Sequence, residues 1–234
     1  MIDVYTWPTP NGHKVHIMLE ETALPYTVHP VNIRSGEQFD PAFLAISPNN
    51  KIPAIVDHEG PEGKSYRLME SGAILLYLAG KTGKLMPESV KGKYDVLQWL
   101  MFQMASVGPM MGQANHFGSN AAPERIEYAI NRYRNEVRRL HGVMEHQLST
   151  AKWIAGSDYS IADIAIFPWL RASERNGIDW REFPRLKAWF DRIVDRPAVQ
   201  RGLNVLSQQV TPAGQYDPKA REVLFGAAQY QRRN

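Results

Sequence analysis

The chain has 234 residues, 44% hydrophobic and 22% charged, which favours a globular protein of two domains, because single domains usually hold about 100–150 residues. Its 27 basic and 24 acidic residues leave a net charge of +3, an excess too small to indicate nucleic acid or a membrane surface as a partner. The sequence contains no cysteine, which excludes disulfides, cysteine-ligated zinc and a cysteine nucleophile.

The first part of the chain alternates between strand and helix signals. In chain order we expect a strand over 2–7, a helix over about 12–23, a strand over 26–33, a short helical connection over 41–46, a hairpin of 52–57 with 65–69, and a helix over 71–81. We place this domain at residues 1–82, followed by a linker at 83–88 in which glycine and proline break the periodicity.

Beyond the linker the strand signals stop, which predicts an all-helical domain over 89–210 and a tail over 211–234. The expected helices are 89–117 interrupted at Gly108-Pro109, 123–149 with Pro123 in its first turn, 161–170, and 184–195. Ser160 and Asp163 read as a capping box at the start of the third helix, so we interpret Asp163 as structural. Arg132 lies outside the apolar stripe of its helix, and we expect it to face the other domain.

The turn at Thr9-Pro10-Asn11-Gly12 joins the first strand to the first helix. A helix start directs backbone N–H groups and a positive dipole end at whatever lies above it, which suits an anionic or thiolate-bearing ligand. Thr9 and Asn11 would be the polar groups presented to that ligand. Taken alone, the turn is better explained as a helix cap with no catalytic task.

Two further segments suggest binding. Pro53 opens a short apolar strand, and a cis Ile52–Pro53 bond would let the Ile52 backbone pair with an extended peptide. Glu70 and Ser71 precede another helix, where N–H groups bind a carboxylate while the glutamate accepts from an ammonium. An α-amino-acid head group needs both.

The order of these motifs resembles the N-terminal domain of glutathione transferases. The Thr9–Gly12 turn together with the Gly108–Gln113 segment is similar to the bacterial nu class and its relatives in the yeast prion protein family. The resemblance covers residues 1 to about 207. It implies a thioredoxin-like α/β domain of order βαβαββα followed by an all-α domain, and a homodimer.

The resemblance also implies a ligand, glutathione, either reduced as a co-substrate or oxidised. Glu70 and Ser71 would hold its γ-glutamyl end, and Gln38 with Lys51 its glycyl end. The residues that the resemblance assigns to glutathione binding are Asn11, Gln38, Lys51, Ile52, Pro53, Glu70, Ser71 and Arg132.

Activation of the glutathione sulfur separates the possible reactions. A free thiol has a pKa near 8.5, and lowering it by one unit stabilises the thiolate by roughly 1.4 kcal/mol. Many family members use a Tyr, Ser or Cys near the end of the first strand, whereas here Thr9 and Asn11 occupy the turn and Tyr5 lies within the strand. We therefore assign Thr9 and Asn11 the catalytic positioning of the sulfur, in a glutathione-dependent reductase of small disulfides with weak conjugation or peroxidase side activity.

Two alternatives remain open. A conventional transferase would use Tyr5 and conjugate electrophiles. A non-catalytic thiol-binding regulator is suggested by the yeast relatives, which carry a long Asn/Gln-rich extension, whereas the first strand here begins at Ile2.

The remaining signals concern metals and location. The seven histidines lack metal-site spacing, so we expect them to be solvated or to cap helices, with no bound metal. No apolar run approaches the roughly 18 residues of a membrane span and no secretory pattern is present, so we expect a cytoplasmic protein.

Overall fold

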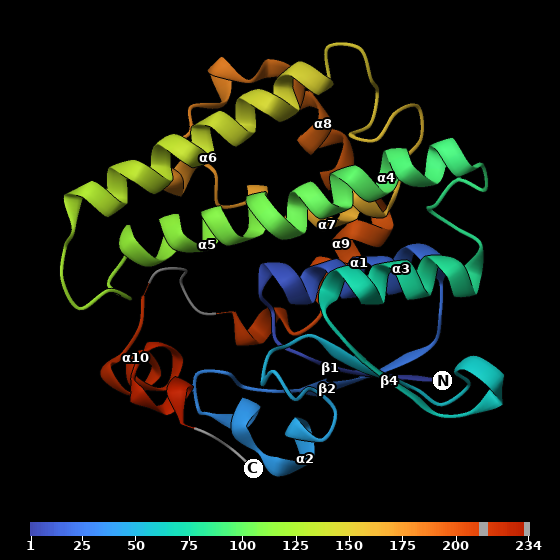
Figure 1. The fold of residues 1–234 in the computed structure, drawn as a ribbon, viewed down its shortest axis with the longest axis horizontal. Helices are drawn as coiled ribbons and strands as arrows, with labels where there is room; N and C mark the ends of the chain where they lie inside the picture. Colours follow the sequence, from blue (N-terminus) through green and yellow to red (C-terminus); the bar gives the residue numbers. More distant parts are fainter. Residues whose placement is uncertain (211–214, 232–234) are drawn as a thin grey trace.

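The structure is a computed structural model that describes residues 1–210 and 215–231. Its first part is a four-stranded sheet of order β2-β1-β3-β4, in which β1 and β2 are parallel and the other pairs antiparallel. The strands are β1 (Ile2–Thr6), β2 (Tyr26–Pro30), β3 (Ala54–Asp57) and β4 (Tyr66–Met69). Helices α1 (Pro10–Thr22) and α3 (Ser71–Thr82) cover the face next to the helical part, and α2 (Pro41–Leu44) lies on the opposite face (Figure 1). This is the predicted thioredoxin-like domain.

The start of α1 is fixed by its cap and by a close backbone approach. Thr9 Oγ1 accepts from the Gly12 N–H at 3.2 Å, and Pro10 occupies the first turn, where no N–H is needed. A Cβ on Gly12 would lie 2.1 Å from the Trp7 carbonyl oxygen, so only glycine fits. The turn therefore holds α1 tightly against the end of β1.

The second part is helical, as predicted. Its elements are α4 (Val90–Phe102), η3 (Gln103–Val107), α5 (Gly108–Phe117), α6 (Glu127–Gln147), α7 (Ile161–Leu170), α8 (Pro184–Val194) and α9 (Pro197–Asn204). Helix α7 is almost wholly buried, and α1 packs against both α7 and α9. Within the described ranges, no helix is both long and apolar enough to cross a membrane.

Several predicted boundaries differ from the structure. The expected break at Gly108-Pro109 is instead a π-helical turn, η3, that joins α4 to α5 without ending the helix. The helix expected from Pro123 begins at Glu127, because Ile126 still has extended backbone. Helices α9 and α10 (Pro218–Phe225) were not predicted, because eight residues give little periodicity.

The prediction of solvated or capping histidines is wrong for three of them. His13, His16 and His141 are buried, and burial lowers the pKa of each, to about 4, about 3 and about 4 respectively. The His16 Nε2 atom lies 2.9 Å from Thr6 Oγ1, and His141 bridges the Val137 carbonyl and the Ser173 hydroxyl. Hydrogen bonds of this kind make a neutral buried imidazole tolerable.

The predicted capping box at the start of α7 is confirmed. Asp163 Oδ2 accepts from the Ser160 N–H at 2.9 Å, and Ser160 Oγ accepts from the Ala162 N–H. Asp163 Oδ1 also accepts from the Ile154 N–H at 2.9 Å and from Trp189 Nε1 at 2.7 Å. The carboxylate thus ties α7 to α8 and to the preceding loop.

Replacing Asp163 by alanine should therefore destabilise the fold strongly. Three buried donors would lose their acceptor, and each unsatisfied group costs about 1–3 kcal/mol, so we expect a loss of at least about 3 kcal/mol. Urea unfolding measures it. The control is Asp158→Ala, at an exposed carboxylate nearby, which should stay within about 0.5 kcal/mol of wild type. Equal stability of the two variants would contradict the structural role of Asp163.

Candidate functional site

A cleft of about 180 Å³ lies where the β1–α1 turn, the segment before β3, the start of α3 and η3 meet. We call it the head-group cleft. Its lining residues are Asn11, Ser47, Asn49, Lys51, Ile52, Pro53, Met69, Glu70, Ser71 and Met104. Most of the residues predicted to bind glutathione are therefore brought together here, from segments that lie far apart in the sequence.

The two binding segments both line the head-group cleft. The Ile52–Pro53 peptide bond is cis, and Ile52 lies two residues before Ala54, the first paired residue of β3. Glu70 has φ +69°, a conformation that few non-glycine residues adopt and that often occurs at functional sites. Its side chain is exposed, whereas Ser71 beside it is buried at the first position of α3. An exposed carboxylate thus stands next to a helix start.

Asn11 is held by the helical part of the molecule. Its Oδ1 atom accepts from Trp169 Nε1, on α7, at 3.0 Å. With the oxygen used in this way, the Nδ2 group is the donor end available to a ligand. Asn11 lines both the head-group cleft and an adjoining interdomain cavity of about 310 Å³, which Gln103, Gly112 and Trp169 also line. It is therefore placed to donate to a group lying between the two.

Thr9 faces a third cavity. Its hydroxyl oxygen accepts from Gly12, which confirms the capping interpretation and leaves the hydroxyl proton available to a ligand. The cavity that it lines, of about 350 Å³, also borders Trp169, Tyr216 and Phe225, and we call it the tail cavity. Thr9 is thus both a cap and a wall of a cavity.

Tyr5 points elsewhere. Its ring stacks on His29 with centroids 4.8 Å apart and packs near Phe43. It lines neither the head-group cleft nor the two cavities beside it.

Two predicted binding residues do not line the head-group cleft. Gln38, in η1 (Glu37–Phe39), is buried, and its Oε1 atom has no hydrogen-bond partner within residues 1–210 and 215–231. Arg132 is exposed on α6, where its charge helps to lower the pKa of Glu136 one turn away, after the larger effect of Arg139. Arg132 also lines neither of the two cavities that adjoin the cleft in this single chain. Its place outside an apolar stripe does not specify which neighbour the side chain meets.

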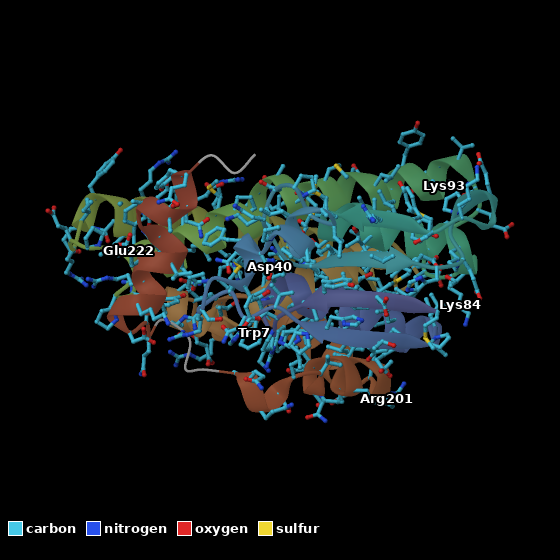
Figure 2. The ribbon with its side chains drawn as sticks, turned by 90° about the horizontal axis from the view of Figure 1, so that it is seen from below. Trp7, Asp40, Lys84, Lys93, Arg201 and Glu222 are labelled. Atoms are coloured by element: carbon cyan, nitrogen blue, oxygen red, sulfur yellow. The ribbon has the colours of Figure 1, made fainter. Side chains whose placement is uncertain are left out.

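The part of the tail that the structure describes, 215–231, folds over the edge of the site. Lys51 Nζ donates to Gln229 Oε1 at 2.9 Å, and Arg34 donates to the Gln215 carbonyl at 3.1 Å. Both figures show α10, which carries Glu222, near the end of α5 (Figures 1 and 2). The tail therefore forms one wall of the tail cavity. The predicted tail residues 211–214 and 232–234 lie outside the described part of the chain.

Lys14 is a residue of the site that was not predicted from the sequence. Its side chain is only 1% exposed, and its ammonium donates to Ser71 Oγ at 3.2 Å and to Gln103 Oε1 at 2.6 Å. Burial lowers its pKa to about 7, against the opposing effect of the Glu70 charge. The available signal was its spacing: Lys14 follows Asn11 by three residues, so both lie on the same face of α1.

Family models for the glutathione S-transferase N-terminal domain and C-terminal domain match residues 9–81 and 98–197. The chain belongs to the glutathione S-transferase family. Among its relatives is the disulfide-bond oxidoreductase YfcG of Escherichia coli, 50% identical over 204 residues that make up 87% of this chain and 94% of that protein.

Solved structures of similar proteins agree with this family. A glutathione transferase from Burkholderia graminis, with two glutathione molecules bound per subunit, has a TM-score of 0.84 and 46% identity, covering 88% of this chain and 89% of that one. One from Pseudomonas putida, with one glutathione disulfide bound per subunit, has a TM-score of 0.83 and 43% identity, covering 88% and 91%.

Proposed function

We propose that this protein is a glutathione-dependent disulfide-bond reductase. The main observation behind the proposal is that the head-group cleft and the interdomain cavity adjoin each other at Asn11, in a chain that has no cysteine of its own. The name of the relative YfcG and the ligands of the B. graminis and P. putida structures support the same reading.

The head-group cleft suits the first glutathione. Glu70 accepts from the γ-glutamyl ammonium, and the Ser71 hydroxyl with the start of α3 binds the carboxylate beside it. The Ile52 backbone pairs with the cysteinyl residue, and Lys51 lies where the glycyl carboxylate would end. Glutathione bound in this way would have its sulfur beside Asn11, at the start of α1.

The neighbouring cavities suit a second glutathione. The head-group cleft and the interdomain cavity share Asn11 and Met104 as wall residues, and the interdomain and tail cavities share Gly112 and Trp169. A second tripeptide in this space has its sulfur within reach of the first. Oxidised glutathione would fill both positions as one molecule.

The chemistry is two thiol–disulfide exchanges. The first glutathione thiolate attacks a small disulfide, forming a mixed disulfide and releasing one substrate thiolate. The second thiolate attacks the glutathione sulfur of the mixed disulfide, which releases the other substrate thiolate and oxidised glutathione. Two glutathione thiols supply both electrons, while Thr9, Asn11 and the start of α1 stabilise the attacking thiolate.

The structure offers less support for the alternative functions than for disulfide reduction. Conjugation by Tyr5 requires its hydroxyl at the sulfur, whereas the ring packs on His29. Peroxide reduction and weak conjugation remain as side activities of an activated glutathione.

We also infer a homodimer, because Val90, Tyr94 and Met101 are exposed on α4 at spacings that share one face.

The kinetic order in glutathione tests the proposal. With a small dialkyl disulfide, we expect the rate above background to rise with the square of the glutathione concentration before saturating, and one oxidised glutathione to form per disulfide reduced. Steady-state assays at varied glutathione measure both. First-order dependence with no oxidised glutathione would indicate conjugation. Binding without turnover would indicate a regulator.

Substitutions in the turn test which residues position the sulfur. Asn11→Ala and Thr9→Ala should each lower kcat/KM for disulfide reduction about 10- to 100-fold, because a hydrogen bond to a charged sulfur is lost. Thr9→Ala also removes a cap worth about 1 kcal/mol, so Thr9→Ser, which keeps the hydroxyl, is its matched control. Tyr5→Phe should retain activity. A large loss in Tyr5→Phe with full activity in Asn11→Ala would establish the tyrosine mechanism instead.

A further inference from the structure

The Lys14 ammonium lies buried at the junction of the two domains without a direct anionic partner. Its contacts are neutral: Ser71 Oγ, Gln103 Oε1 and, at 3.5 Å, Met104 Sδ. No carboxylate lies within salt-bridge distance of it in residues 1–210 and 215–231. A buried cation is costly unless an anion compensates it, so a site of this kind is suited to receive one.

The helical domain is shaped to hold this cation. The π-helical turn η3 turns Gln103 toward Lys14, and π-helical turns are frequent at functional sites. The Gln103 side chain is 1% exposed, and its Nε2 atom lacks a partner in the described part of the chain. A Cβ on Gly108 would lie 2.8 Å from that atom, so any larger residue at this position would displace the Gln103 amide. The network is thus built from both domains.

Lys14 also determines what Ser71 offers to a ligand. Because Ser71 Oγ accepts from the ammonium, its own proton is directed at another acceptor, which in this structure is Met104 Sδ at 3.8 Å. A carboxylate oxygen is a stronger acceptor than a thioether sulfur, so a bound ligand would replace Met104 as the partner of this hydroxyl. Ser71 lines the head-group cleft, and Lys14 lines the interdomain cavity that adjoins it. The lining of the cleft therefore includes a carboxylate, Glu70, and next to it a hydroxyl that accepts from a buried cation. This distribution of charge is complementary to a zwitterionic α-amino acid.

We propose that Lys14 is a positioning residue for the α-carboxylate of the γ-glutamyl group. It orients the Ser71 hydroxyl as a donor to that carboxylate and supplies the positive charge behind it. The inference rests on the proposed binding of glutathione and adds the cationic half of its head-group recognition.

Proton uptake follows from the environment of Lys14. Its pKa of about 7 means that the ammonium loses its proton as the pH rises above 7 in the unliganded protein. A bound carboxylate stabilises the protonated form, so ligand binding at pH 8 should take up a proton. Glu70 is the charged group acting on Lys14, while Ser71, Gln103 and Met104 do not titrate.

The test pairs two variants with three ligands by titration calorimetry. The first ligand is S-methylglutathione, which has no titrating thiol. The second carries 4-aminobutyryl in place of the γ-glutamyl group and so lacks the α-carboxylate. The third carries glutaryl in that place and so lacks the ammonium. Lys14→Met should weaken S-methylglutathione about 10- to 100-fold and leave the 4-aminobutyryl analogue unchanged. Glu70→Gln, the matched control, should weaken S-methylglutathione and leave the glutaryl analogue unchanged.

Repeating the titration in buffers of different ionisation enthalpy gives the number of protons taken up when the ligand binds. Wild type should take up a proton at pH 8 that Lys14→Met does not. Replacing a buried charge by an apolar side chain is often neutral for folding, and Lys14→Gln serves if Lys14→Met does not fold. If Lys14→Met weakens S-methylglutathione and the 4-aminobutyryl analogue equally, or weakens neither, the inference is overturned. If wild type binds none of the ligands, the proposed function fails and the inference with it.

Discussion

Polar side chains from the two domains bond to one another across a buried boundary, and the site depends on that match. Trp169 of α7 donates to Asn11 of α1, and Lys14 of α1 donates to Gln103 of η3. Buried polar groups left without partners cost about 1–3 kcal/mol each, so the domains pack stably only in the register that satisfies them. This register sets the position of the head-group cleft and of the cavities beside it.

In the proposed reaction, the lack of cysteine means that glutathione supplies the reactive sulfurs, and the protein contributes orientation and charge. The start of α1 supplies both. Thr9 closes the turn as a cap and faces the tail cavity, and Asn11 is oriented by Trp169. The described tail adds a further wall to the tail cavity through Tyr216 and Phe225, so this cavity depends in part on residues outside the matched C-terminal domain.

The features of the site that could be predicted are those with local sequence signals. The Thr9–Asn11 turn and the Glu70-Ser71 helix start were readable because caps and prolines mark element boundaries. Lys14 was missed because its partners lie 57 and 89 residues away, and one partner depends on a π-helical turn that no local pattern announces. For Arg132 the sequence was also insufficient. Helix periodicity shows that this side chain lies outside the core, but it does not show which element the side chain faces. The fold was predictable because long apolar periods and a resemblance to a known family agreed.

A crystal structure with oxidised glutathione tests the central claim most directly. We expect one γ-glutamyl group on Glu70 and Ser71, the disulfide beside Asn11, and the second tripeptide in the cavities bordered by Gly112 and Trp169. A structure with one glutathione, its sulfur away from Asn11 and an empty apolar cavity beside it, would contradict the account and favour conjugation.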